Sequence, residues 1–468
     1  MKQVLRKFVP KTVLGWYHLA LAKIAAAWYW RPSEKMVVIG VTGTNGKSTT
    51  VNLIARILEE ACSAKAELLP NQSSALRHCV GLTSTVNFKV GEKEWLNPTK
   101  MTMLGRFALQ KLLRDMVDAG CKYAVVETSS EGIKQYRHRG INYDVAVFTN
   151  LTPEHIESHG GFENYKKAKG ELFRHLTRMP RKPAQIFVSQ KFQSGKIPKI
   201  SVVNGDDQYA EYFLQFPADG KWIYGLGKIA TASGLAMTNL VGHDVHMDAT
   251  GSRFVVDGVE LKLKLLGEFD VYNALAAIAV ARALGVDLQI CKTALEKVEG
   301  VPGRLERIDE GQNFTVIVDY APEPASLQAL YRVVKMLPHN RVIHVLGSTG
   351  GGRDRSRRGV LGKIAAKHAD TVIVTNEDPY DDDPMEIIEE VARGARECKM
   401  KNVKCKMIEL LRILDRKEAI AKALSLSQKD DLVLITGKGA EQAMCVAGGK
   451  KIPWDDREVV KTLLSSRH

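Results

Sequence analysis

The feature that most constrains the fold of this chain is a glycine-rich stretch, GVTGTNGKSTT, at residues 40–50. It follows an apolar run, KMVVI, and precedes a segment whose apolar residues recur at helical spacing. A strand that enters a helix through such a loop presents backbone N–H groups and the helix N-terminus to a phosphate. The common spelling of these loops has one more glycine, at the position of Val41. The stretch therefore predicts a phosphate-binding loop within an α/β fold.

The residue types in the loop suit a nucleoside triphosphate with Mg²⁺. Glycines allow the backbone to wrap an anion, a lysine reaches the terminal phosphates, and a serine hydroxyl binds the metal. A plain glycine turn is the alternative, but Gly-Lys-Ser-Thr-Thr at a strand-to-helix junction argues against it. The loop residues predicted to contact the phosphates, which the resemblance given below assigns to ATP, are Gly43, Thr44, Asn45, Gly46, Lys47, Ser48 and Thr49.

Two more buried strands are predicted, at 122–130 and 143–152, and both end in polar residues. Because ligands bind at the carboxyl ends of parallel strands, these residues are expected around the phosphate loop. Glu127 is a natural second ligand for Mg²⁺, and His155 is a candidate metal ligand. Taken alone, such a carboxylate is more often a cap or an ion-pair partner, and a single histidine is more often structural.

The strand and helix pattern restarts after VPGRLERI at 301–308, which reads as a linker with a Pro-Gly turn. The fold class expected is α/β: a central P-loop ATPase domain with a mostly parallel sheet and a C-terminal Rossmann-like domain. The second domain has no G-x-G-x-x-G after its first strand, so no redox cofactor is expected. The predicted domains are 1–35, an apolar helical segment, then 36–299 and 300–468. Strands are expected at 314–321, 341–348, 370–378 and 431–439, and helices at 48–61, 266–286, 324–337, 358–368, 384–398 and 416–427.

Three further sites carry open alternatives. Lys169 lies in YKKAKGELF, where by spacing alone a solvated basic face is the default. Asp319 ends a predicted strand and could hold a ribose hydroxyl. The cluster RDRSRR at 353–358 is either a solvated charge run or a set of arginine forks for carboxylate or phosphate.

Composition narrows the partners. Lys and Arg outnumber Asp and Glu by 67 to 53, a formal net charge of +14. That surplus suits nucleic acid, an anionic membrane surface or phosphate-rich small substrates. No basic-aromatic platform or recognition-helix pattern is present, so nucleic acid is not expected. The seven cysteines have no C-x-x-C spacing and an odd count, which argues against a zinc ribbon or a disulfide framework and for a reducing, cytoplasmic compartment.

The first 35 residues form a separate case. The stretch 12–30 is apolar and aromatic and follows several basic residues, but His18 and Lys23 interrupt it, which argues against a spanning helix. A basic, Trp-bearing helix could lie at a membrane interface, as a peripheral contact. A helix packed on the body of the protein is the slightly favoured alternative.

Taken together, the motifs resemble those of the Mur ligase superfamily, most closely its MurE-type, tripeptide-forming branch. The resemblance runs from about residue 36 to 460 and rests on these stretches in order: TGTNGKSTT, ETSSEGI, FTNLTPEH, YKKAKGELF, VPGRLE, VDYAPEP, GGGRDRSRR and TGKGAE. It implies an ATP-dependent amide ligase of peptidoglycan precursor synthesis that acts through an acyl phosphate. The implied substrates are a UDP-muramoyl dipeptide ending in D-Glu and a diamino acid, and the implied state is a monomer.

The resemblance also implies residue roles. Lys47, Glu127, His155 and Lys169 would be catalytic; Ser48 and Glu127 would hold one Mg²⁺ and His155 a second. Lys169 aligns with a lysine that the family carbamylates, which turns a cation into an anion able to support a metal. Nucleotide contacts would include Asn273, Arg304 and Asp319. Substrate contacts would be Thr102, Ser129, Gln135, Arg137, Arg353, Asp378, Tyr380, Gly437 and Glu441.

Departures from the family pattern bear on the substrates. Only about 35 residues precede the central domain, so the usual uridine-binding domain is expected to be missing or reduced to a helix; a lipid-linked acceptor is one hypothesis. Diaminopimelate-adding members have Asp-Asn-Pro-Arg where this chain has Glu-Asp-Pro-Tyr, so Tyr380 replaces the arginine that grips the distal carboxylate. Such a loss is not conservative. Lysine or another diamine would suit Asp378 and the acidic run 381–383.

Some competing interpretations keep the fold and change the substrate, and another replaces the enzyme by a non-catalytic protein. A folylpolyglutamate- or cyanophycin-synthetase-like ligase would share the fold, but the pattern of Ser129, Gln135 and Arg137 speaks against it. The Mur-like subunit of a glutamine-dependent amidotransferase normally carries a four-cysteine zinc ribbon, which this chain lacks. A non-catalytic nucleotide-binding protein would have no need of the combined set Lys47, Glu127, His155 and Lys169.

Overall fold

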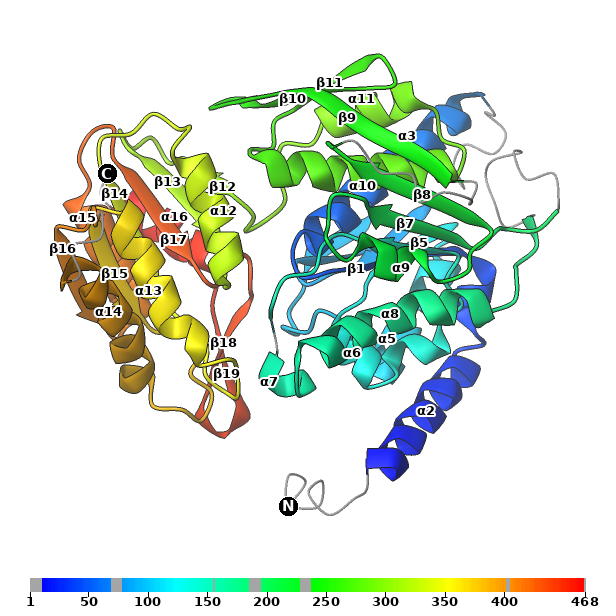
Figure 1. Ribbon diagram of the computed structural model, residues 1–468, viewed down its shortest axis with the longest axis horizontal. Coiled ribbons are helices and arrows are strands. Elements are labelled where there is room, and N and C mark those ends of the chain that lie inside the picture. Colours follow the sequence, from blue (N-terminus) through cyan, green and yellow to red (C-terminus); the bar gives the residue numbers. More distant parts are fainter. Residues whose placement is uncertain are drawn as a thin grey trace.

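Two sheets organise the chain, one of eleven strands and one of six, in the computed structural model (Figure 1). The structure describes residues 11–68, 78–154, 156–184, 195–227, 237–400 and 405–466. In Figure 1 the six-stranded sheet and its helices, coloured yellow to red, stand beside the larger sheet, coloured blue to green. The expected mixed α/β class is confirmed.

The eleven-stranded sheet has the order β11-β10-β9-β8-β7-β6-β1-β5-β2-β3-β4. Its middle, from β9 to β2, is parallel, and hairpins extend it at both edges. Parallel strands covered on both faces are apolar throughout, as the fully buried β1 illustrates. The strands are β1 Val37–Thr42, β2 Val80–Thr83, β3 Asn87–Val90, β4 Lys93–Leu96, β5 Tyr123–Glu127, β6 Val145–Phe148, β7 Ile200–Asn204, β8 Gly220–Gly225, β9 Met237–Asp248, β10 Gly251–Val256 and β11 Val259–Leu263.

Helices cover both faces of this sheet and make two cores. Alternate residues of β1 point to opposite faces, so Val37, Ile39 and Val41 join one core while Val38 joins the other. One core is closed by α3 Lys47–Leu68, α10 Glu268–Ala283 and α11 Leu288–Glu296. The other is closed by α5 Arg106–Asp118, α6 Ser130–Lys134, α8 Phe162–Arg178 and α9 Ala210–Leu214, with η3 Arg137–Gly140 and α7 Ile156–His159 nearby.

The six-stranded sheet has the order β12-β13-β17-β14-β15-β16, parallel except for β12. The predicted strands and helices of this region are confirmed, but β12, β16 and the small β18–β19 hairpin were not predicted. The elements are β12 Glu306–Ile308, β13 Thr315–Asp319, α12 Pro324–Val334, β14 Val342–Leu346, α13 Ser356–His368, β15 Thr371–Thr375, α14 Pro384–Met400, β16 Glu409–Ile413, α15 Arg416–Leu426, β17 Leu432–Thr436, β18 Ala443–Val446, η5 Ala447–Gly449, β19 Lys450–Pro453 and α16 Asp456–Ser465. The domain boundary near residue 300 stays a prediction.

One cysteine pair departs from the sequence-based expectation. Cys62 in α3 and Cys79 before β2 form a disulfide, with Cα atoms 6.5 Å apart, so the expectation of no disulfide framework is wrong for this pair. An odd count excludes only complete pairing, and packing of α3 on β2 brings these two within bridging range. Around this disulfide, α3 continues to Leu68 and β2 begins at Val80; residues 69–77 lie outside the described part.

At the N-terminus, α2 Lys11–Trp28 and η1 Pro32–Lys35 precede β1. Figure 1 shows α2 at the periphery, against the end of the body that carries α5 and α6. Among the described residues, none of the helices is sufficiently long and apolar to traverse a bilayer. A helix packed on the body was the favoured prediction for this segment, and one face of α2 does pack on the protein.

Candidate active site

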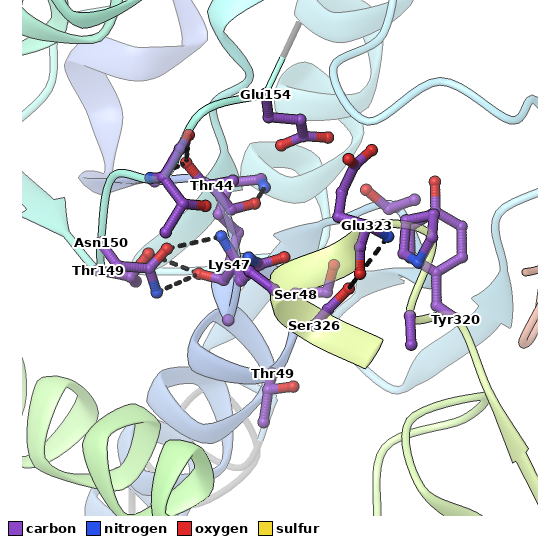
Figure 2. A pocket seen from close by; sticks show the side chains of 18 of the residues that line it. Thr44, Lys47, Ser48, Thr49, Thr149, Asn150, Glu154, Tyr320, Glu323 and Ser326 are labelled. Atoms are coloured by element: carbon purple, nitrogen blue, oxygen red, sulfur yellow. Dashed lines mark hydrogen bonds between the residues drawn. The ribbon is translucent and has the colours of Figure 1, made fainter. Parts of the chain in front are cut away.

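The glycine-rich loop lies between β1 and α3, at the carboxyl ends of three adjacent strands. Its shape is held by hydrogen bonds to the segment after β6: Thr44 N–H donates to the Asn150 carbonyl at 2.8 Å, and Asn45 N–H to Asn150 Oδ1 at 2.8 Å. The Thr149 hydroxyl donates back to the Asn45 carbonyl at 2.7 Å. These contacts are drawn in Figure 2. The loop is therefore shaped before a ligand arrives, which lowers the entropy cost of binding an anion.

A serine and a carboxylate meet beside the loop where a Mg²⁺ ligand pair is predicted. The Ser48 hydroxyl donates to Glu127 Oε2 at 2.9 Å, across the gap between α3 and the end of β5. Thr85 holds the same carboxylate through its N–H at 2.7 Å and its hydroxyl at 3.0 Å. A buried carboxylate with a serine hydroxyl is a donor set that suits Mg²⁺. Within the described residues there is no cluster of three or more His, Cys, Asp or Glu that could hold a metal.

Lys169 is fully buried on α8 and reaches the loop from the opposite face of the sheet. Its Nζ donates to the Gly43 carbonyl at 2.6 Å and lies 4.5 Å from the centre of the Tyr165 ring. Burial, and then the charge of Lys47, hold the pKa of Lys169 well below its usual value. The neutral amine is the form that reacts with carbon dioxide, so this environment suits carbamylation. The default of a solvated basic face is wrong for this lysine; Lys167, two residues earlier, is the exposed one.

The far side of the loop is lined by α10. Asn273 Oδ1 accepts from the Thr50 hydroxyl at 3.2 Å, and its Nδ2 donates to Asp270 at 2.9 Å. Gly46 has φ +80°, and a side chain there would collide with Asn273. Burial raises the pKa of Asp270 to about 7 although Asn273 donates to it. The loop and α10 are thus fitted closely to each other.

The linker into the second sheet passes along the same cavity. Asp319, at the end of β13, accepts the Leu305 N–H at 2.7 Å, and burial raises the pKa of its carboxyl. The Arg304 guanidinium lies 4.6 Å from the centre of the Tyr320 ring. Leu305 has φ +46°, a left-handed conformation unusual for this residue. The Asp319 carboxylate therefore accepts a hydrogen bond from the linker backbone and also lines the cavity.

Four charged side chains from three distant segments meet at the other end of the cavity. Asp378 and Glu441 are held by Lys438, at 3.0 and 2.8 Å, and by Lys100 from the central region, which lies 2.9 Å from Glu441 and contacts Asp378. Burial would lower the pKa of Lys100, but Glu441 and Asp378 outweigh it and raise that pKa. Burial would raise the pKa of Asp378, but Lys438 and Lys100 hold it below its usual value. Lys100 lies in none of the stretches that carry the resemblance, and Lys438 lies in one of them, TGKGAE, but had no role predicted from the sequence.

A second pair of carboxylates, Glu154 and Glu323, lies where the two sheet regions face each other across the cavity. Glu323 precedes α12, forms an ion pair with Arg357, and lies opposite Glu154 (Figure 2). Burial, and then Glu154, raise the pKa of Glu323 to about 8. Arg357 also donates to the Thr349 hydroxyl at 2.6 Å. Sequence reasoning treated residues 353–358 as one cluster and missed both glutamates.

One cavity of about 450 Å³ connects these groups. Most of the predicted site residues line it, from both sheets: Gly43, Thr44, Asn45, Gly46, Lys47, Ser48, Thr49, Thr102, Glu127, Ser129, Lys169, Asn273, Arg304, Asp319, Arg353, Asp378, Tyr380 and Glu441. Arg357, from the predicted basic cluster at 353–358, also lines the cavity, and the lining residues missed by the sequence include Thr85, Lys100, Glu154, Tyr165, Asp270, Glu323 and Glu377.

Three predicted residues lie outside this cavity and one lies outside the described residues. Arg137 begins η3 and contacts the Met103 carbonyl, and its Nη2 donates to Gln135 Oε1 at 2.8 Å. Gly437 follows β17 with φ +110°, where a side chain would press on Glu377. His155 is the residue that the described part omits. The roles predicted for all four stay predictions.

Comparison with known proteins agrees with this geometry. Residues 41–281 match the model of the Mur ligase middle domain, and residues 303–439 match that of the Mur ligase glutamate ligase domain. A UDP-N-acetylmuramyl-tripeptide synthetase of Roseiflexus sp. (strain RS-1) is 38% identical over 455 residues, covering 96% of this chain and 82% of the relative. A UDP-N-acetylmuramoyl-L-alanyl-D-glutamate–2,6-diaminopimelate ligase of Geobacillus kaustophilus is 35% identical over 463 residues, covering 98% and 85%.

A solved structure with the same ligase name, UDP-N-acetylmuramoyl-L-alanyl-D-glutamate–2,6-diaminopimelate ligase, superimposes with a TM-score of 0.54 at 28% identity. The superposition covers 92% of this chain and 79% of that one. The first matched model covers most of the larger sheet, and the second covers the whole six-stranded sheet. On this evidence, the chain belongs to the Mur ligase family.

Proposed function

We propose that this Mur ligase uses ATP to join the D-glutamyl carboxylate of a muramoyl dipeptide to the amine of a diamino acid, in peptidoglycan precursor synthesis. The observation that carries the proposal is a cavity with a preformed phosphate loop at one end and a cluster of two carboxylates and two lysines at the other. A ligase that activates a carboxylate before an amine attacks needs both ends within reach of one substrate. The relatives' names supply the substrate class.

The chemistry follows from the groups at the loop. An oxygen of the acceptor carboxylate attacks the γ-phosphorus of ATP, the bond to the β-phosphate oxygen breaks, and ADP leaves. The amine nitrogen then attacks the acyl carbon, phosphate leaves, and the amine loses a proton. Two anions must approach in the first step, and Lys47, which lines the cavity, would screen that repulsion.

Mg²⁺ fits this site through the Ser48 hydroxyl and the Glu127 carboxylate, with His155 and a carbamate on Lys169 as further candidates. When bound, Mg²⁺ neutralises phosphate charge. The residues' own part is to place the loop: Lys169 ties it to α8, and Asn150 ties it to the end of β6.

The carboxylates of Asp378 and Glu441, at the end of the cavity far from the loop, favour a diamino acid without a second carboxylate. Asp378 and Glu441 already hold an ammonium group, that of Lys100, and the distal ammonium of lysine or ornithine would fit the same pair of carboxylates. The resemblance to the family implies that Tyr380 takes the position of an arginine found in diaminopimelate-adding members, so the distal carboxylate of meso-diaminopimelate would lack a guanidinium partner here. We therefore propose lysine or a similar diamine ahead of meso-diaminopimelate.

The test measures phosphate release from ATP with UDP-N-acetylmuramoyl-L-Ala-D-Glu and, in turn, lysine, ornithine and meso-diaminopimelate, with mass spectrometry of the product. The expected result is a tripeptide with lysine or ornithine, and no release when the amino acid or the dipeptide is omitted. If folded, ATP-binding protein releases no phosphate with any of the three, the acceptor is a different one, and lipid-linked muramoyl peptides and folates are tested next. A product with meso-diaminopimelate alone would contradict the specificity and leave the reaction standing.

A further inference from the structure

The helix α2 has one face packed on the protein and one face bare. Ala22, Ala25 and Ala26 are buried where α2 packs on η3, and a side chain at Gly140, at the end of η3, would collide with the Ala22 carbonyl. Arg106 of α5 donates to the His18 carbonyl at 3.2 Å. Small residues thus hold α2 close to the body along one side.

The opposite face is apolar, aromatic and exposed. Trp16 and Trp28 are 73% and 71% exposed, and Ile24 between them is 52% exposed. These positions recur at helical spacing, so they form one continuous stripe. The exposed residues of the stripe are Val13, Trp16, Tyr17, Ala20, Lys23, Ile24, Ala27 and Trp28, followed by Trp30 in the next turn.

The charge around the stripe indicates an anionic partner. The first 33 residues hold six basic residues and no Asp or Glu; Lys23 is exposed within the stripe, Arg31 is exposed just after it, and the others are Lys2, Arg6, Lys7 and Lys11. Three of the six tryptophans of the chain, Trp16, Trp28 and Trp30, lie in the same segment. Trp and Tyr are enriched where a bilayer meets water, and basic residues bind anionic headgroups.

A second copy of the chain fits this face less well. A two-fold contact pairs the same patch from both copies, so it would bring the basic residues of the two N-terminal segments close together. The segment offers no carboxylate to pair with them. A spanning role is also excluded, because α2 is too polar by composition and one of its faces is buried against the protein.

We propose that the exposed stripe of α2 is a peripheral docking surface for an anionic lipid bilayer, with the aromatic side chains at the headgroup level. Because α2 packs on η3, which begins at Arg137, docking would hold the predicted acceptor contacts beside the membrane. That last consequence rests on the proposed function; the docking itself does not.

The test is sedimentation of the full chain with vesicles of phosphatidylcholine alone, or of phosphatidylcholine with about one third phosphatidylglycerol, at rising salt concentration. Tryptophan emission is read in parallel. The expected result is binding to the anionic vesicles, a blue shift on binding, and loss of binding as salt rises.

Two variants and their matched controls locate the surface. Trp16→Ser/Ile24→Ser/Trp28→Ser and Lys23→Glu/Arg31→Glu are each expected to weaken partitioning by about ten-fold or more. The controls change the same kinds of exposed side chain elsewhere and should bind as the unaltered chain does: Trp95→Ser/Ile408→Ser/Ile452→Ser and Lys422→Glu/Lys429→Glu.

Several outcomes overturn the proposal. No binding to anionic vesicles, or equal binding by the α2 variants, removes α2 as a lipid surface. A chain that dimerises in solution, and becomes monomeric when the stripe is changed, assigns the stripe to a second copy. No substrate enters these measurements, so their failure is separate from a failure of the ligation assay.

Discussion

The two ends of the cavity bind by different physical means. The loop end consists of a contiguous run, residues 43–49, and is held largely by hydrogen bonds to backbone groups. The other end consists of side chains, among them Lys100 and Asp378, which are 278 residues apart, and it is held by ion pairs. Backbone groups recognise a phosphate that every such enzyme shares, whereas side chains can be exchanged to choose an amino acid.

The largest expected effect tests the loop end. Lys47→Met should lower the rate of phosphate transfer by about a thousand-fold or more, because no other cation of the loop faces the transferred group. Single-turnover phosphate release measures it. Lys65→Met, on the same helix, is the control and should retain the rate. A loss below ten-fold would contradict the role given to Lys47.

The next effect tests the buried lysine beneath the loop. Lys169→Ala should lower turnover by about a hundred-fold, since it removes both a loop contact and the predicted carbamate. Lys167→Ala, on the exposed face of the same helix, is the matched control.

A direct measurement separates the two roles of Lys169. With ¹³C-bicarbonate, the unaltered protein should give a carbamate resonance that Lys169→Ala lacks, and short carboxylic acids should restore part of the variant's activity. A missing resonance with normal turnover would exclude the carbamate.

A smaller effect tests the amino-acid end. Lys100→Met should lower KM for lysine by about three- to ten-fold, because the substrate ammonium no longer displaces a resident one from Asp378 and Glu441. KM for ATP should stay unchanged, which contrasts the two ends directly. A higher KM for lysine would mean that Lys100 belongs to the binding site itself.

The smallest effect concerns two buried histidines, one packed against the larger sheet and one within the six-stranded sheet. Burial lowers the pKa of His175 on α8 to about 4, and that of His344 on β14 to about 3. Both are neutral when folded, so the unfolded chain takes up more protons as pH falls below about 6.5. Stability is therefore full above that pH and falls below it, by about 1 kcal/mol for each histidine at pH 5.5.

Thermal unfolding at pH 7.5 and 5.5 measures this loss. His175→Gln and His344→Gln should each flatten the pH dependence, and equal flattening would indicate that both regions unfold as one unit. A melting temperature that does not change between the two pH values would contradict the assignment of neutral histidines.

Much of the framework was predictable from local pattern. The strands β1, β5 and β6 and the helix α3 were predicted because buried runs and helical spacing are properties of neighbouring residues. The strands β4, β16 and β19 were missed because short strands with exposed side chains carry weak periodicity. The disulfide was missed because pairing depends on a contact between α3 and β2 rather than on cysteine spacing.

The sequence by itself determined the phosphate loop, the α/β class and the family, because contiguous backbone motifs and their order along the chain carry that information. Only the tertiary structure decided the amino-acid end, where Lys100 meets Asp378 and Glu441. It also decided that Lys169 is buried and that one face of α2 is bare. The physical reason is that burial and ion pairing depend on which distant segments the packed sheets bring together, and no local pattern encodes that distance.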